Sequence, residues 1–163
     1  MLTSCEARVY RPTTPRLPAL AVSLALVCSA CSESLKDLER SHPAKEPAPA
    51  SVVDGQTVVL SSPRHRGAFT FDGSVSQAFT ESGVYLEVRQ LGPSTRLWIL
   101  LPAITGCSRT QWGGGRWDTN LWVEDAQVLI CFPDNDDHLV QWCKDRGLTV
   151  FDRATQSKWL HER

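Results

Sequence analysis

The sequence predicts an α+β domain in which one helix, near residues 136–146, covers a mainly antiparallel sheet. Short runs rich in β-branched and aromatic residues alternate with turn signals through the middle of the chain, a pattern that indicates successive strands. The period then changes to that of an amphipathic helix between two apolar runs. At 163 residues, with 42% hydrophobic and 21% charged residues, the composition is that of a globular chain with room for one domain.

Four strands are predicted in the middle of the chain. Residues 57–60 are rich in β-branched side chains, and residues 68–71 alternate and end at a turn dipeptide. Residues 84–90 alternate cleanly, and residues 96–101 follow them at hairpin distance. We therefore expect the last two of these strands to pair antiparallel.

A strand–helix–strand unit is predicted in the last third of the chain. Residues 127–132 are nearly all apolar, as expected of a strand that is covered on both faces. Residues 136–146 begin with acids and end with basic residues before Gly147, which favours a helix, and residues 148–151 then form a strand. Positions i, i+3 and i+4 give this helix an apolar stripe toward the sheet: Leu139, Trp142 and Cys143.

The first 30 residues have the organisation of a secretory signal peptide. An uncharged apolar run occupies residues 17–27, and small residues follow it. Three arginines precede the run: Arg8, Arg11 and Arg16. This order of basic, apolar and small residues is typical of a signal for export. The run is too short for a transmembrane helix, which needs about 20 apolar residues.

Cys28-Ser29-Ala30-Cys31 resembles the lipobox of bacterial lipoproteins, in which a small residue precedes an acylated cysteine. The resemblance implies cleavage before Cys31, a diacylglyceryl thioether on its sulfur and usually a third chain, such as palmitate, on its amine. Two or three chains hold a protein at a membrane durably. Ser32 then implies sorting to the outer membrane, facing the periplasm. The alternative is ordinary cleavage that leaves Cys31 as a free N-terminal thiol. A redox pair is not expected at the end of a signal segment.

A flexible tether is predicted over residues 31–50, between the lipidated cysteine and a single globular domain at residues 51–163. The segment carries charges of both signs and several prolines, so it is too polar to bury a core. Leu35 and Leu38 are expected to support one helical turn at most, and His42 is expected to be solvated.

The cysteines constrain the redox chemistry of the domain. If Cys31 is acylated, three thiols remain outside the signal peptide in an oxidising compartment. We then expect one disulfide among Cys107, Cys131 and Cys143, with the third cysteine outside it. If Cys31 is not acylated, four thiols remain and two bridges become possible.

The sequence offers little chemistry for catalysis or metal binding. The net charge of −1 provides no basic footprint for nucleic acid, and no catalytic motif is present. The acids at residues 134–137 lack the glycine and glutamate of a calcium loop and are better interpreted as the start of a helix. We expect no metal, no cofactor and no enzymatic activity. A hydrolase would require Glu81, Asp118 and His65 to converge.

Large aromatic residues occupy the polar faces of three predicted strands. Side chains alternate along a strand, so Tyr85 and Trp98 lie opposite aliphatic neighbours, and Trp122 does so in a further strand. Tryptophan, tyrosine and arginine are enriched at binding hot spots. The candidate partner-binding residues include two tryptophans that bracket a glycine loop: Tyr85, Trp98, Trp112, Arg116, Trp117 and Trp122. The alternative is that the helix covers this face, which would make Trp98 or Trp122 part of the core.

The sequence therefore favours a non-enzymatic lipoprotein that is anchored in the bacterial envelope and recognises a protein partner. By analogy with other small lipoproteins, an immunity or inhibitor protein is one form of this function. A structural or assembly lipoprotein of an envelope machine is an alternative. A cell-wall glycan-binding module is another, because indole rings stack on sugars.

Overall fold

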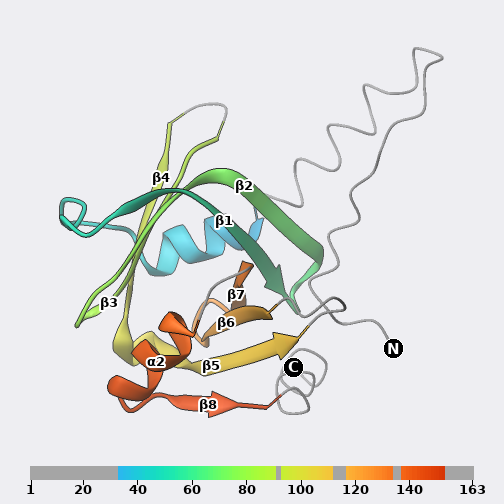
Figure 1. The fold of residues 1–163 in the computed structure, drawn as a ribbon. Coiled ribbons are helices and arrows are strands. Elements are labelled where there is room, and N and C mark those ends of the chain that lie inside the picture. Colours follow the sequence, from blue (N-terminus) through green and yellow to red (C-terminus); the bar gives the residue numbers. More distant parts are fainter. Residues whose placement is uncertain (1–32, 91–92, 112–116, 134–136, 153–163) are drawn as a thin grey trace.

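The computed structural model describes residues 33–90, 93–111, 117–133 and 137–152. Eight strands form one sheet in the order β4-β3-β2-β1-β7-β6-β5-β8, and Figure 1 shows that this sheet curls into a half-barrel. The strands are β1 (Val53–Ser62), β2 (His65–Phe79), β3 (Gly83–Val88), β4 (Thr95–Leu100), β5 (Ile104–Gln111), β6 (Trp117–Val123), β7 (Val128–Pro133) and β8 (Thr149–Phe151). A 3-10 turn, η1 (Leu101–Ala103), joins β4 to β5.

The α+β class and the mainly antiparallel sheet are confirmed. The β3–β4 hairpin forms as predicted, with Tyr85 opposite Trp98. Only the short strand β8 pairs in parallel among the strand pairs described, and it does so with β5. The prediction of a single covering helix is not confirmed, because the chain is helical at residues 33–41 as well as in α2 (His138–Asp145). No helix in the described part of the chain is long and apolar enough to cross a bilayer.

The predicted tether is wrong for the helix at residues 33–41. The side chains of Leu35 and Leu38 are 3% and 0% exposed and belong to the main hydrophobic core. The polar composition of the segment led to the prediction of a tether, although these two leucines lie one turn apart on a single helix face. A helix this short is marginal alone, but the inner face of the sheet supplies the apolar surface that stabilises it. The folded domain therefore includes residues that precede residue 51.

The chain that follows this helix extends the sheet at its β4 edge. Pro43 bridges Leu97 in antiparallel orientation. The Trp98 amide donates to the His42 carbonyl, and the Ala44 amide donates to the Arg96 carbonyl, both at 3.0 Å. Backbone pairing of this kind satisfies part of an otherwise open strand edge.

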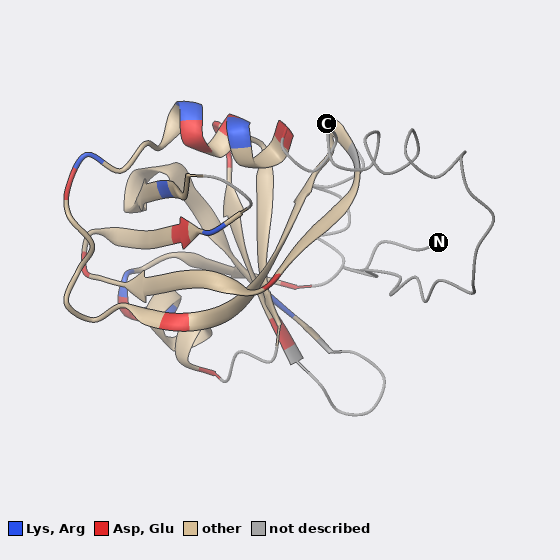
Figure 2. Ribbon diagram, turned by 90° about the horizontal axis from the view of Figure 1, so that it is seen from above, with Lys and Arg blue, Asp and Glu red and all other residues tan. Residues whose placement is uncertain are grey.

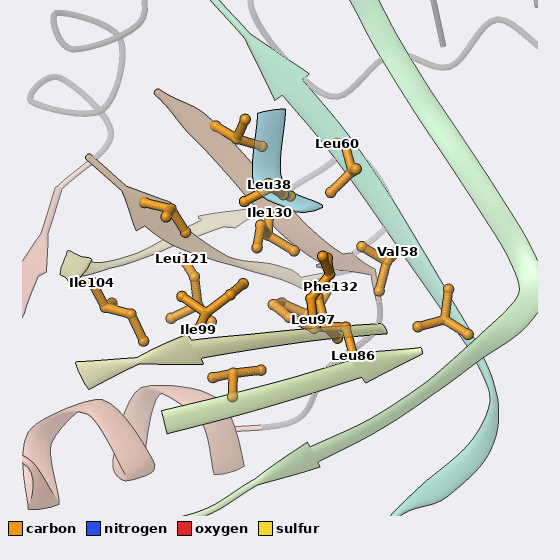
Figure 3. Packing of buried hydrophobic residues seen from close by; sticks show 14 of the residues in the cluster. Leu38, Val58, Leu60, Leu86, Leu97, Ile99, Ile104, Leu121, Ile130 and Phe132 are labelled. Carbon is orange, nitrogen blue, oxygen red and sulfur yellow. The ribbon is translucent and has the colours of Figure 1, made fainter. Parts of the chain in front are cut away.

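The hydrophobic core fills the inside of the curled sheet (Figure 3). Alternate residues of β1, β3, β4, β6 and β7 point into it, because strand side chains alternate between faces. Leu38 of the N-terminal helix enters the same cluster as residues of β4, at one end of the sheet order, and of β5, near the other end. The labelled members are Leu38, Val58, Leu60, Leu86, Leu97, Ile99, Ile104, Leu121, Ile130 and Phe132.

The predicted strand–helix–strand unit is present as β7, α2 and β8. The chain leaves β7, passes through α2 and returns beside β5, so β6 and β5 lie between the two strands of the unit. The predicted apolar stripe of the helix is buried: Leu139, Trp142 and Cys143. The Trp142 indole N–H donates to the carbonyl oxygen of Thr80 at 2.9 Å, which fixes α2 to the end of β2.

Candidate functional site

A pocket of about 490 Å³ lies at the β4 edge of the sheet, beside the end of the N-terminal helix. Its lining comes from the helix end, the segment after it, the β2–β3 turn and β4: Arg40, Ser41, His42, Pro43, Lys45, Glu46, Ser82, Trp98 and Leu100. Figure 2 shows both basic and acidic residues along this helix and in the segment that follows it. The pocket therefore combines an aromatic wall with charged side chains of both signs.

The segment after the N-terminal helix, which lines the pocket, is fixed by both backbone and side-chain hydrogen bonds. The backbone bonds of His42 and Ala44 to β4 fix its course. The His42 side chain, 7% exposed, places Nε2 2.8 Å from Oδ1 of Asp125 in the β6–β7 turn. The expectation that His42 is solvated is therefore wrong. Because the segment is tied to two separate parts of the sheet, the pocket is a built feature of the fold.

Trp98 and Leu100 provide the apolar part of the pocket. They lie on the outer face of β4, because the alternate residues Leu97 and Ile99 point into the core. Leu100 is 50% exposed, although it is a large aliphatic residue. Trp98 is half-buried and packs edge-to-face against the Tyr85 ring, with centroids 5.7 Å apart. This contact orients the indole toward the pocket.

The charged residues of the pocket favour an acidic or mixed ligand. Arg40 and Lys45 contribute two cations, and Glu46 contributes one acid. Arginine and tryptophan are among the residue types that are enriched at protein-binding hot spots. The Nε2 atom of His42 is engaged by Asp125.

Tyr85 does not present its ring to a partner, which corrects its assignment as a binding residue. It lies on the predicted outer face but is 0% exposed. Its hydroxyl donates to Glu87 at 3.1 Å, and burial together with this carboxylate raises the pKa of Tyr85. The sequence pattern indicated its face correctly but gave no sign that this face is covered here. Tyr85 acts as a support for Trp98.

Trp122 is also buried, at 2% exposed, so its assignment to a binding surface is wrong. Phe151 of β8 stacks on the indole with ring centroids 4.2 Å apart and planes 3° from parallel. Gly106 makes room for this stack, because a Cβ there would collide with the Phe151 ring. β8 adds to the sheet beside β5 and carries Phe151 to the outer face, which local alternation in β6 does not reveal.

The structure does not describe the side chains of the other predicted binding residues. Trp112 and Arg116 lie outside the described residues, and so does the side chain of Trp117, the first residue of β6. β4 and β6 are separated by β3, β2, β1 and β7 in the sheet. The strands therefore do not bring Trp98 and Trp122 side by side.

Sequence reasoning missed Arg40, His42, Lys45 and Leu100. The first three fell within the segment interpreted as a tether. A signal for Leu100 was present, because strand alternation places it on the same face as Trp98. The long-range pairing of His42 with Asp125 left no signal in the local pattern.

The cysteines in the described part of the chain form one disulfide, as expected, between Cys107 of β5 and Cys143 of α2, with Cα atoms 6.5 Å apart. Cys131 is buried on β7, and its thiol donates to Oδ2 of Asp118 at 3.7 Å. The predicted lipidation site, Cys31, lies outside the described residues. Its acylation therefore stays a prediction.

The residues proposed for a hydrolase are not assembled. His65 begins β2 and lies 2.8 Å from the Asp37 carboxylate, whereas Glu81 lies beyond the other end of that 15-residue strand. Asp118 is buried on β6. Among the described residues, no group of three histidine, cysteine, aspartate or glutamate side chains could hold a metal ion.

No protein-family model matches this chain, and no curated protein sequence matches it.

Proposed function

We propose that this protein is an envelope-anchored, non-enzymatic lipoprotein that binds a protein partner through the pocket at the β4 edge. The observation that carries the proposal is the pairing of Trp98 with the exposed Leu100 beside Arg40 and Lys45. Apolar anchors flanked by charged residues, on a backbone fixed by the sheet, are the usual basis of protein recognition.

The proposed location rests on the beginning of the chain and on its cysteines. Cys28-Ser29-Ala30-Cys31 resembles a lipobox and follows a segment with signal-peptide organisation. The Cys107–Cys143 disulfide supports an oxidising compartment, because disulfides persist in the periplasm and are rare in the cytosol. Together these features favour an outer-membrane lipoprotein that faces the periplasm.

The partner of the pocket is proposed to be a protein segment with apolar and acidic side chains. Leu100 and Trp98 would cover an apolar side chain, and the two cations would pair with carboxylates. An immunity or inhibitor role is one form of this function. A cell-wall glycan is the second candidate, favoured by the half-buried indole of Trp98, since sugar rings stack on such faces.

A structural or assembly lipoprotein in which a flexible tether sets a spacing is less well supported. The helix at residues 33–41 is packed in the core, so shortening it would remove core residues and would not shorten a spacer.

The proposal is tested by capture with the chain from residue 32 onward, tagged at its C-terminus. Cells that express the native neighbouring genes provide the partner, and the recovered protein is then purified and titrated directly. Leu100→Asp should abolish binding, whereas the control Val53→Asp, at a residue 55% exposed on β1, should preserve it. Equal affinity of the two variants for the purified partner would refute the pocket as its site. Retention on purified peptidoglycan without a protein partner would favour the glycan candidate.

A further inference from the structure

We infer that the first turn of the N-terminal helix and the tip of the β1–β2 hairpin form the surface that lies against the bilayer, in contact with lipid headgroups. This inference rests on the proposed acylation of Cys31. In this arrangement the domain lies directly on the membrane surface in one orientation and does not hang from a flexible tether.

Only a short length of chain separates the proposed anchor from the fold. Glu33 is the second residue after Cys31. An extended chain covers at most about 3.6 Å per residue, so the Cα atoms of Cys31 and Glu33 lie within roughly 7 Å of each other. Acyl chains on Cys31 would have to enter the hydrocarbon, and the start of the helix must then lie at the headgroups.

The N-terminal helix is firmly attached to the rest of the domain. Leu35 and Leu38 are buried in the core. Oδ2 of Asp37 lies 2.8 Å from Nε2 of His65 at the β1–β2 tip, and His42 just beyond the helix pairs with Asp125. Because the helix cannot turn independently of the sheet, the position of the anchor fixes the orientation of the whole domain.

The surface beside the proposed anchor carries basic side chains. Lys36 is 54% exposed and forms an ion pair with Glu33 at 2.9 Å. Arg64, at the hairpin tip, donates from Nε to the neutral side-chain oxygen of Gln127 at 2.8 Å and has no carboxylate partner among the described residues. Its charge is thus available to lipid phosphate, and arginine binds phosphate well.

This orientation also determines how far the proposed binding pocket lies from the membrane surface. Arg40 and His42 line the pocket at the opposite end of the same helix. With a rise of about 1.5 Å per residue, the helix from residue 33 to residue 41 spans roughly 12 Å. A partner in the pocket would therefore be recognised close to the membrane surface, which favours a membrane-associated partner over a freely diffusing one.

The test uses the full-length chain produced in a bacterial host and its acyl-free counterpart, residues 32–163. Intact mass first establishes whether Cys31 carries acyl chains. The acylated protein is then placed in vesicles of phosphatidylethanolamine and phosphatidylglycerol and treated with a membrane-impermeant amine reagent. Peptide mass spectrometry compares the modification of Lys36 with that of the exposed Lys144 on α2.

We expect the Lys36-to-Lys144 ratio to fall several-fold on vesicles relative to the acyl-free protein. A flexible linker of glycine and serine inserted between Ser32 and Glu33 should restore the ratio without loss of the acyl mass, whereas the same linker at the C-terminus should not. Arg64→Glu should reduce the protection of Lys36. The control Lys144→Arg should not, and in that variant the modification of Lys36 is compared with that of Lys45 instead of Lys144.

The outcomes separate the inference from the proposed anchor. A chain without the acyl mass overturns the anchor, and the inference with it. An acylated, vesicle-bound chain whose Lys36 reacts as it does in the acyl-free protein overturns the inference alone. Unchanged protection in Arg64→Glu removes the hairpin tip from the membrane surface.

Discussion

The ring of His42 and the carboxylate of Asp125 lie 2.8 Å apart, although 83 residues separate them in the sequence. An ionised carboxylate can only accept, so the ring Nε2 donates the hydrogen bond. Asp125 also accepts from the amide of Ala126 at 2.8 Å, which orients the carboxylate within its turn. The pair connects the pocket segment to the β6–β7 turn and so holds one wall of the candidate site.

Replacing His42 by alanine should destabilise the domain by about 1–2 kcal/mol, because the substitution removes a buried ring and its hydrogen bond. Asp125→Ala should have a smaller effect, since that carboxylate is half exposed. Urea denaturation measures both changes. In the native state, amide exchange at Ala44 should accelerate in His42→Ala more than exchange in β6. Glu46→Ala, an exposed residue of the same segment, is the control.

Leu38→Ala should destabilise the domain by about 2–5 kcal/mol, because it leaves a cavity where a leucine is fully buried. Glu39→Ala, at the next and exposed position of the helix, should change stability by less than about 0.5 kcal/mol. Thermal or urea unfolding of the chain from residue 32 onward provides the measurement. If both variants unfold like the parent protein, the segment does not belong to the core.

Reduction of the Cys107–Cys143 disulfide should lower the free energy of unfolding by about 3–4 kcal/mol, from the entropy of a loop closed across 36 residues. The double variant Cys107→Ser/Cys143→Ser should show a similar loss and no further response to reductant. Cys131→Ala should keep the response, because that residue lies outside the bond. A parent protein whose urea midpoint is the same with and without reductant would contradict the expectation.

Local patterns in the sequence predicted much of the sheet and of α2. Alternation placed Val84, Leu86 and Val88 in the core and Tyr85 on the opposite face, and the structure agrees. The apolar stripe of α2 could be predicted for the same reason, because the helical period is a local pattern of a few neighbouring residues. The expectation of one disulfide followed from counting cysteines, although the sequence left the pair open.

The remainder depends on contacts between distant segments. Leu35 and Leu38 form an apolar stripe that is too short to predict a stable helix. The helix is stable because these two residues pack against the inner face of the sheet. Trp122 was assigned to the correct face, but its burial depends on Phe151 in a strand that enters the sheet from the end of the chain. Of the candidate site, only Trp98 was predicted and Leu100 could have been, since the residues opposite them come from the supposed tether.

Glu87 should make the stability of the domain depend on pH in the acid range. A hydrogen bond from the Ser94 hydroxyl is the largest cause that lowers the pKa of Glu87, and the Tyr85 hydroxyl and the nearby Arg96 act in the same direction. Since the folded state favours the charged carboxylate, the stabilisation is fully present above the ordinary pKa near 4.5. It is lost as the pH falls through the lower value of the folded protein.

Glu87→Gln should therefore reduce stability at pH 7 and flatten the loss of stability between neutral and acid pH. Urea denaturation of the parent and variant at a series of pH values measures the difference. The control is Glu81→Gln, an exposed glutamate in the β2–β3 turn, whose profile should follow that of the parent. Because Tyr85 supports the Trp98 indole, Tyr85→Phe should weaken partner binding through the loss of the hydrogen bond that its hydroxyl donates to Glu87. Parallel pH profiles for Glu87→Gln and the parent would show that this carboxylate does not stabilise the fold.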